Sequence, residues 1–189
     1  MTWRFGSDLF VIPNLFRDLV FWLMNLGLKA PPCRRGSLLW IRFLSPMKVT
    51  LREDTHPDPD FYYQQQFEIY HEPYLIWDRE TWEAVLTTCD VYRIEIDGRY
   101  GGDVILEDRG KGIKYIVDFS VLPDYQGKGI GRSAVEQIKK MTRKLTAVTR
   151  KETLHFFLKS GFVLRKTLKN YYDRGVDGFY IAFARKPEK

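Results

Sequence analysis

The 189-residue chain is poor in the residues from which disulfide-rich, metal-binding and membrane-spanning proteins are built. Its two cysteines, Cys33 and Cys89, show neither a disulfide framework nor a metal-ligand spacing, so we expect a reducing, cytoplasmic setting and no bound metal. In the hydrophobic N-terminal part the longest unbroken apolar run is Leu19–Met24. A bilayer span needs roughly 20 apolar residues, so no transmembrane segment is expected. The sequence also lacks internal repeats and low-complexity tracts.

The composition that is present is that of a globular protein. Apolar residues make up 44% and charged residues 29% of the chain, which excludes wholesale disorder. The net charge of +6 is unevenly spread: residues 51–83 have a net charge of −7 and residues 125–170 a net charge of +10. The basic part could contact phosphate and the acidic part could attract a cation, or both could be ordinary solvated surface. Since no basic motif is interleaved with aromatic residues, nucleic acid is not expected as a partner.

Residues 1–46 differ from the rest of the chain. They contain three of the five tryptophans and have a net charge of +4. Charged residues inside the apolar region argue against a secretory signal. A membrane-surface helix, a partner-binding arm and a disordered tail remain open. The stretch Val11–Leu19 resembles peptides read from dispersed bacterial repeat DNA, which favours a mis-called start. We therefore expect an N-terminal extension over 1–46 and one domain over 47–189, beginning at Met47.

From Met47 onward the hydrophobic pattern predicts strands and helices in one domain. Alternating apolar residues on both sides of Asp97-Gly98 predict a hairpin, and the largely apolar stretch 113–121 predicts a central strand. Asp78 is expected to cap a helix, and 171–178 to form the loop between the last two strands. The predicted strands are 48–53, 91–96, 100–106, 113–121, 145–148, 162–168 and 179–184, and the predicted helices are 57–71, 78–86, 133–143 and 152–159. This order predicts an α+β or α/β fold built on a mixed sheet.

Between the central strand and the next helix lies the glycine-rich stretch Pro123-Asp-Tyr-Gln-Gly-Lys-Gly-Ile-Gly-Arg-Ser133. Glycines before a helix leave backbone N–H groups open at the positive end of the helix dipole, where an anion can bind. The spacing fits neither a Walker loop, because Lys128 lies inside the glycine series, nor a dinucleotide-binding loop. The stretch therefore predicts a phosphate site of another kind.

Three blocks of sequence together resemble the GNAT N-acetyltransferases. The spacing Gln126-x-x-Gly129-x-Gly131 resembles the family's acetyl-CoA loop, Gln/Arg-x-x-Gly-x-Gly/Ala. The block Phe-Phe-Leu-Lys-Ser-Gly-Phe over 156–162 is similar to the later Phe-Tyr-x-Lys-x-Gly-Phe element, and Asn170-Tyr-Tyr172 is similar to the bacterial ribosomal-protein N-terminal acetyltransferase branch. The resemblance covers about residues 47–186.

The resemblance implies a three-layer fold with a mixed, mostly antiparallel central sheet flanked by helices, and acetyl-CoA as the co-substrate. It implies that the backbone of strand residues Phe119, Ser120 and Val121 pairs with the pantetheine arm. It also implies that the pyrophosphate of CoA lies on the loop amides of Gln126, Gly127, Lys128, Gly129, Ile130, Gly131 and Arg132. The basic segment 125–170 would then face the phosphates.

The residues that complete the chemistry in the family are altered in this chain. Phe157 stands where members commonly have a tyrosine acid, and Arg150 where they have an asparagine that contacts CoA. The glutamate base often found on the preceding strand is replaced by Leu145 or Thr146. Transfer to an amine still needs a proton acceptor for the ammonium group and a weak acid for the departing thiolate.

Asp118 and Tyr172 are the substitutes that we select as catalytic residues. Asp118 lies on the central strand, near the expected acetyl group, and Tyr172 lies where related enzymes line the acceptor groove. An anchoring role for Asp118 and a packing role for Tyr172 are the simpler interpretations to be weighed against these. The other candidates considered, each with a surface or packing interpretation, are Tyr171, His155, His56, His71, Glu68 and Glu72.

The sequence thus predicts an N-acetyltransferase that moves the acetyl group of acetyl-CoA directly to a primary amine in a ternary complex. The acceptor would be a protein N-terminus, a lysine or a small amine, and the protein a monomer or homodimer. The alternative is a GNAT-fold acyl-CoA-binding regulatory module without turnover, which the altered residues favour.

Overall fold

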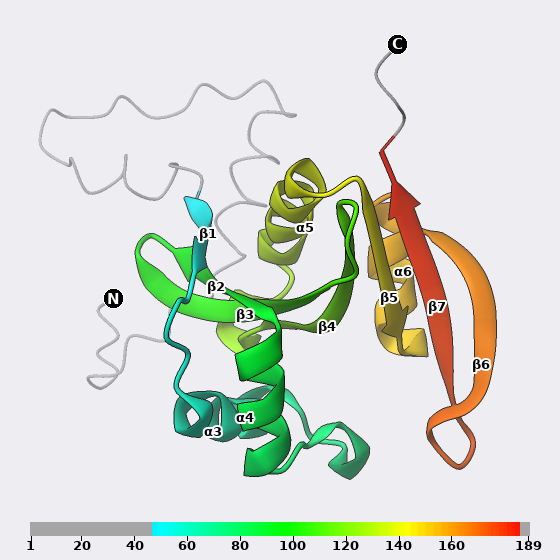
Figure 1. Ribbon diagram of the computed structural model, residues 1–189, viewed down its shortest axis with the longest axis horizontal. Helices are drawn as coiled ribbons and strands as arrows, with labels where there is room; N and C mark the ends of the chain where they lie inside the picture. The colour runs from blue at the N-terminus through cyan, green and yellow to red at the C-terminus, as the bar shows by residue number, and fades with distance from the viewer. Residues whose placement is uncertain (1–46, 186–189) are drawn as a thin grey trace, which may run out of the picture. The chain divides into compact units, whose positions relative to one another are not determined.

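The computed structural model describes residues 47–185, and Figure 1 shows how their strands and helices are arranged. The predicted extension over 1–46, with Leu19–Met24 and Cys33, lies outside these residues. Among the helices that the structure describes, none has the length and apolar character needed to cross a membrane.

The strands form one seven-stranded sheet in the order β1-β2-β3-β4-β5-β7-β6. Their bounds are β1 Val49–Glu53, β2 Asp90–Ile96, β3 Arg99–Asp108, β4 Ile113–Val121, β5 Lys144–Thr149, β6 Val163–Asp173 and β7 Val176–Ala184. Within residues 47–185, β4 and β5 are the one parallel pair, and every other neighbouring pair is antiparallel. The predicted mixed, mostly antiparallel sheet is therefore confirmed.

Helices cover both faces of this sheet (Figure 1). The helices are α3 Pro59–Ile69, α4 Arg79–Thr88, α5 Ile130–Met141 and α6 Lys151–Lys159, with short 3-10 turns η1 Pro73–Leu75 and η2 Pro123–Tyr125. On one face Tyr62 of α3 and Trp82 of α4 pack with Ile105 of β3. On the other, Ile138 of α5 packs with Val104, which points away from Ile105 because strand side chains alternate. This is the predicted three-layer arrangement.

Local chemistry explains where the helices begin. The Asp78 carboxylate accepts a hydrogen bond from the Thr81 amide (2.7 Å), so the predicted cap of α4 is confirmed. Helix α5 begins at Ile130, three residues before the predicted start, because Gly129 adopts φ 82° and turns the chain directly into the helix. The first turn of α5 is therefore part of the glycine loop.

The predicted loop over 171–178 is wrong. Strand β6 continues to Asp173, and β7 begins at Val176 after a tight turn in which Gly175 has φ 83°. Tyr171 and Tyr172 consequently lie on a strand. The tight turn needs only one residue with positive φ, which the chain supplies at Gly175, so both strands extend toward the end of the hairpin.

Candidate active site

The site is built around a gap in the sheet between β4 and β5. Their parallel pairing covers only Ile113–Ile116 with Lys144–Ala147. Beyond it, residues 117–121 of β4 pair with β3 alone, and the end of β5 pairs with β7. A register shift between β3 and β4 leaves Val117 as an extra residue, and such bulges bend the strand that carries them. The backbone of β4 is thus left without a strand partner on its β5 side.

The glycine loop follows this unpaired part of β4. Among the described residues, the amides of 127–132 donate no hydrogen bond, and no side chain caps α5. Gly127 and Gly129 have φ of 72° and 82°, and a Cβ added to either would meet nothing within 4 Å. The loop therefore presents open N–H groups and open space at the N-terminus of a 12-residue helix, which together favour an anion.

Gln126 ties the loop to the strand. Its side-chain Nε2 donates to the carbonyl of Val121 (2.9 Å), and its backbone amide donates to the carbonyl of Pro123 (3.1 Å). Of the amides predicted to meet the pyrophosphate, the one from Gln126 is thus already engaged. The side chain of Lys128 donates to the carbonyl of Asp124 (2.6 Å), a second hydrogen bond that stabilises the loop.

Gly131 differs from the two glycines before it. A Cβ there would lie 3.3 Å from the ring of Phe156 and 3.5 Å from that of Phe119. These rings lie on α6 and β4, so the absence of a side chain lets α5 approach both elements closely. Gly131 therefore serves packing, whereas Gly127 and Gly129 leave room for a ligand.

Asp118 lies on β4 directly after the bulge. Its Oδ1 accepts a hydrogen bond from the hydroxyl of Tyr70 (2.6 Å), while its Oδ2 is buried and has no partner. Burial raises the pKa of the Asp118 carboxyl, and the Tyr70 hydrogen bond lowers it in part. Tyr70, at the end of α3, was not singled out from the sequence, because nothing in its local pattern relates it to a strand 48 residues away.

Tyr172 lies on the other side of the gap. Its hydroxyl donates to the carbonyl of Val148 (3.0 Å), which belongs to the part of β5 beyond the parallel pairing. Its ring lies 6.2 Å from that of Tyr74 in η1. Burial, followed by the neighbouring Tyr171 hydroxyl, raises the pKa of Tyr172 above its ordinary value, and the charge of Asp118 adds to this. The two predicted catalytic residues therefore lie within electrostatic reach of one another.

The altered family positions have structural roles. Phe157 is 5% exposed and packs against Phe119, Phe156 and Phe162. Leu145 and Thr146 are both buried in β5.

Arg150, just before α6, makes an ion pair with Glu72 (2.8 Å). The sequence candidate Glu72 is thus paired with Arg150. The pair joins the residue before α6 to the residue before η1.

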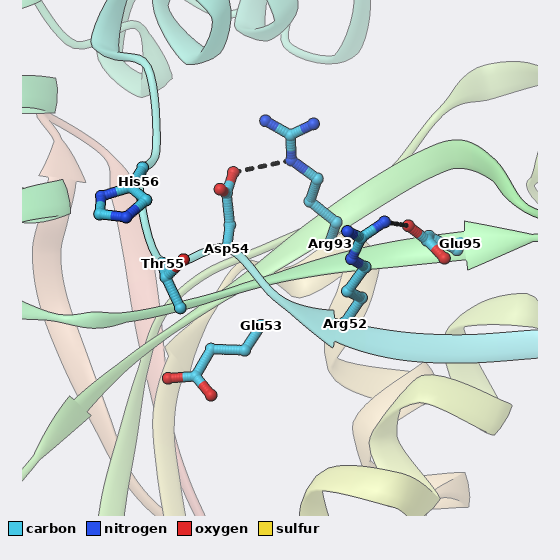
Figure 2. Close-up of a pocket in the computed structure, with 7 residues that line it drawn as sticks. All are labelled: Arg52, Glu53, Asp54, Thr55, His56, Arg93 and Glu95. Carbon is cyan, nitrogen blue, oxygen red and sulfur yellow. Dashed lines mark hydrogen bonds and ion pairs between the residues drawn. The ribbon is translucent and has the colours of Figure 1, made fainter.

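The remaining sequence candidates lie elsewhere. His56 lines a polar hollow formed by the end of β1, the residues that follow it and β2, which Figure 2 shows together with its charged neighbours. There Asp54 Oδ2 accepts hydrogen bonds from Arg93 Nε (2.7 Å) and the Tyr62 hydroxyl (2.9 Å), so the charges of Asp54 and Arg93 neutralise each other. His71, His155 and Glu68 are exposed.

Comparison with protein-family models finds a match over part of the chain. The sequence model of the acetyltransferase (GNAT) domain matches residues 87–164, a range that includes β4, the glycine loop and α6. Comparison with curated protein sequences gives no match.

Solved structures agree with the fold at low sequence identity. The ribosomal-protein-S18-alanine N-acetyltransferase from Escherichia coli is 18% identical with a TM-score of 0.62, over 75% of this chain and 97% of that one. A GNAT family acetyltransferase from Elizabethkingia anophelis, solved with acetyl-CoA bound, is 18% identical with a TM-score of 0.57, over 72% and 98%. A Bacillus subtilis acetyltransferase in complex with CoA is 16% identical with a TM-score of 0.58, over 74% and 100%.

Proposed function

We propose that the chain is a GNAT acetyltransferase and that it transfers the acetyl group of acetyl-CoA directly to a primary amine in a ternary complex, which the match of the GNAT family model to residues 87–164 supports. The observation that carries this proposal is the gap between β4 and β5 with the open amides of 127–132 beside it. The unpaired edge of β4 suits an extended chain of amide groups, and the open amides suit phosphate. Pantetheine and pyrophosphate, joined in this order in CoA, have this chemistry.

In this proposal the cofactor is held by backbone groups. The N–H and C=O groups of Phe119, Ser120 and Val121 pair with the pantetheine arm where β5 has diverged. The amides of residues 127–132 bind the pyrophosphate, with the helix dipole of α5 adding to the attraction. The Ser120 side chain is buried and accepts a hydrogen bond from the Asp103 amide, so its contribution to the cofactor comes from its backbone.

Proton transfer would run along residues on the two sides of the gap. An ammonium group gives one proton to the Tyr70 oxygen while Tyr70 gives its own hydroxyl proton to Asp118 Oδ1. The neutral amine then attacks the thioester carbon, and the C–S bond breaks. Tyr172 turns its hydroxyl from the Val148 carbonyl and protonates the departing sulfur. The nitrogen then loses its second proton to the Tyr172 oxygen, which restores the Tyr172 hydroxyl.

The acceptor in this proposal is a primary amine, either a protein N-terminus, a lysine or a small amine. The acidic segment 51–83 includes α3, η1 and the first half of α4, and its charge supports a cationic acceptor approaching from that side of the sheet.

A two-step experiment tests the proposal against a regulatory module without turnover. Calorimetry first measures CoA binding, and thiol release from acetyl-CoA is then followed over a panel of protein N-termini, lysine peptides and polyamines. We expect binding and amine-dependent thiol release. Binding without release from any acceptor would favour the regulatory module, and no binding would refute both.

The residue roles are tested with Asp118→Asn and Tyr172→Phe. We expect each to reduce kcat by about 10²–10⁴-fold, the usual contribution of a general base or acid, with CoA affinity retained. Full activity in both variants would show that the residue assignments are wrong and would favour a water chain as the base.

A further inference from the structure

A second aspartate lies beside Asp118 in the sheet. In the β3–β4 register Asp103 pairs with Ser120, and Ile105 pairs with Asp118. Asp103 and Asp118 are therefore diagonal neighbours on the face of the sheet that α3 and α4 cover. Their carboxyl groups lie within hydrogen-bonding reach of each other.

Each of the two carboxyl groups has one satisfied and one unsatisfied oxygen. Asp103 Oδ2 accepts a hydrogen bond from the Tyr100 hydroxyl (2.6 Å), as Asp118 Oδ1 does from Tyr70. Asp103 Oδ1 and Asp118 Oδ2 are both buried and without a partner. Two carboxylate oxygens cannot bond to each other, because both only accept, but a single proton between them would satisfy both.

No positive charge compensates this pair within the described residues. Asp103 is 3% exposed, and neither aspartate makes an ion pair with a lysine, arginine or histidine of 47–185. The charge of Arg150 acts on Tyr70, and Arg150 is itself paired with Glu72. The titratable groups that face the pair from neighbouring elements are Tyr62, Tyr70, Tyr100, Tyr172 and Arg150.

We propose that Asp103 and Asp118 hold one proton between Asp103 Oδ1 and Asp118 Oδ2, so that the pair carries a single negative charge. Two buried like charges in contact cannot both ionise without a large electrostatic cost. Burial, and then the neighbouring Asp118 charge, raises the pKa of Asp103 well above its ordinary range. Asp103 is accordingly the protonated partner and Asp118 the carboxylate.

Asp103 is thus a positioning residue that acts through Asp118. By donating to Oδ2 it fixes the orientation of the Asp118 carboxylate and leaves Oδ1 to Tyr70. In the proposed reaction, on which this part of the inference rests, Asp118 takes up a proton that comes from the ammonium group. Both carboxyl groups are then uncharged. The buried site then holds no net charge while the amine attacks.

The first test is the pH dependence of folding stability. A pKa raised in the folded state stabilises the fold below the unfolded pKa of about 3.9, and this stabilisation is lost as the pH rises toward the folded pKa. Asp103→Asn retains a donor to Asp118 and an acceptor for Tyr100 but carries no titrating proton. We therefore expect the folding constant of the variant, divided by that of the wild type, to rise about tenfold per pH unit above about pH 5.

The control is Asp124→Asn, which makes the same replacement at an exposed aspartate in η2. A ratio for Asp103→Asn that changes with pH no more than the ratio for this control would overturn the proposal.

The second test needs no folded variant. Infrared spectra of the wild-type protein with isotope-labelled aspartate should show a protonated carboxylic acid at neutral pH, and its absence would overturn the proposal. Where the variant folds, Asp103→Asn should remove this band. If the wild type releases no thiol with any amine, the proposed function fails, whereas the infrared band still decides whether the proton is shared.

Discussion

At the scale of single residues, Phe157 carries the clearest departure from the acetyltransferase pattern. Its ring centroid lies 5.0 Å from that of Phe156 and 5.2 Å from that of Phe162. A hydroxyl at this position would enter an aromatic core. The side chain of Phe157 belongs to the packing of α6 against the sheet. A tyrosine at this position would therefore place its hydroxyl in the core and not in an open site.

We accordingly expect Phe157→Tyr to destabilise the protein by about 1–3 kcal/mol, the cost of a buried hydroxyl without a partner, and to leave the rate unimproved. Denaturant unfolding and thiol release would measure the two effects. A faster enzyme with unchanged stability would show instead that this position faces the site.

The proposed catalytic residues and their partners could be anticipated from the sequence only in part. Asp118 could be selected because an acidic residue in a largely apolar strand is unusual. The same signal is present at Asp103, between Gly102 and an apolar run, but its meaning depends on the β3–β4 register, and a one-residue shift would turn it to the other face. Tyr70 and Tyr100 meet these aspartates only through the tertiary fold.

At the scale of elements, the glycine loop is the feature on which the cofactor proposal depends. Gly129 and Gly175 have nearly equal φ (82° and 83°), and a Cβ at either would meet nothing within 4 Å. One lies at the start of α5 and the other in the turn between β6 and β7. The two glycines thus have the same left-handed backbone conformation but lie in different parts of the structure.

We expect Gly129→Ala and Gly175→Ala to cost a similar free energy of unfolding, about 1–2 kcal/mol from the left-handed backbone. Only Gly129→Ala should weaken CoA binding, by at least tenfold in calorimetry, because its Cβ would occupy the space of a phosphate. Equal CoA affinities in the two variants would contradict the assignment of the loop.

The sequence predicted the elements well where local rules decide them. The Asp97-Gly98 turn and the Asp78 cap are local signals, and both are found as expected. The start of α5 and the length of β6 were wrong because glycines with positive φ permit an abrupt helix start and a tight hairpin. The gap between β4 and β5 depends on where strand pairing stops, which no local pattern encodes.

At the scale of the whole molecule, the uneven charge follows the layers. The acidic segment 51–83 includes α3 and the first half of α4, and the basic segment 125–170 includes α5, β5 and α6. The proposed cofactor phosphates and the proposed cationic acceptor would therefore approach through opposite layers. This arrangement supports a ternary complex, in which both substrates are bound before transfer.

All of the described elements lie after Met47. We expect a chain beginning at Met47 to bind CoA with the affinity of the full-length protein and to unfold at the same denaturant concentration. Calorimetry and denaturant unfolding of the two chains would show this, and mass spectrometry of the native N-terminus would show where translation begins. Lost CoA binding in the shorter chain would assign residues 1–46 to the site.

The central claim is that the backbone of the glycine loop binds the pyrophosphate of CoA. The most direct measurement is an NMR titration of the isotope-labelled full-length protein with CoA, followed at individual backbone amides. We predict that the amide signals of residues 127–132 and 119–121 shift with saturation, and that the signal of Gly175 stays in place. Saturable binding that leaves the signals of Gly127 and Gly129 unchanged, or no binding at all, would contradict the claim.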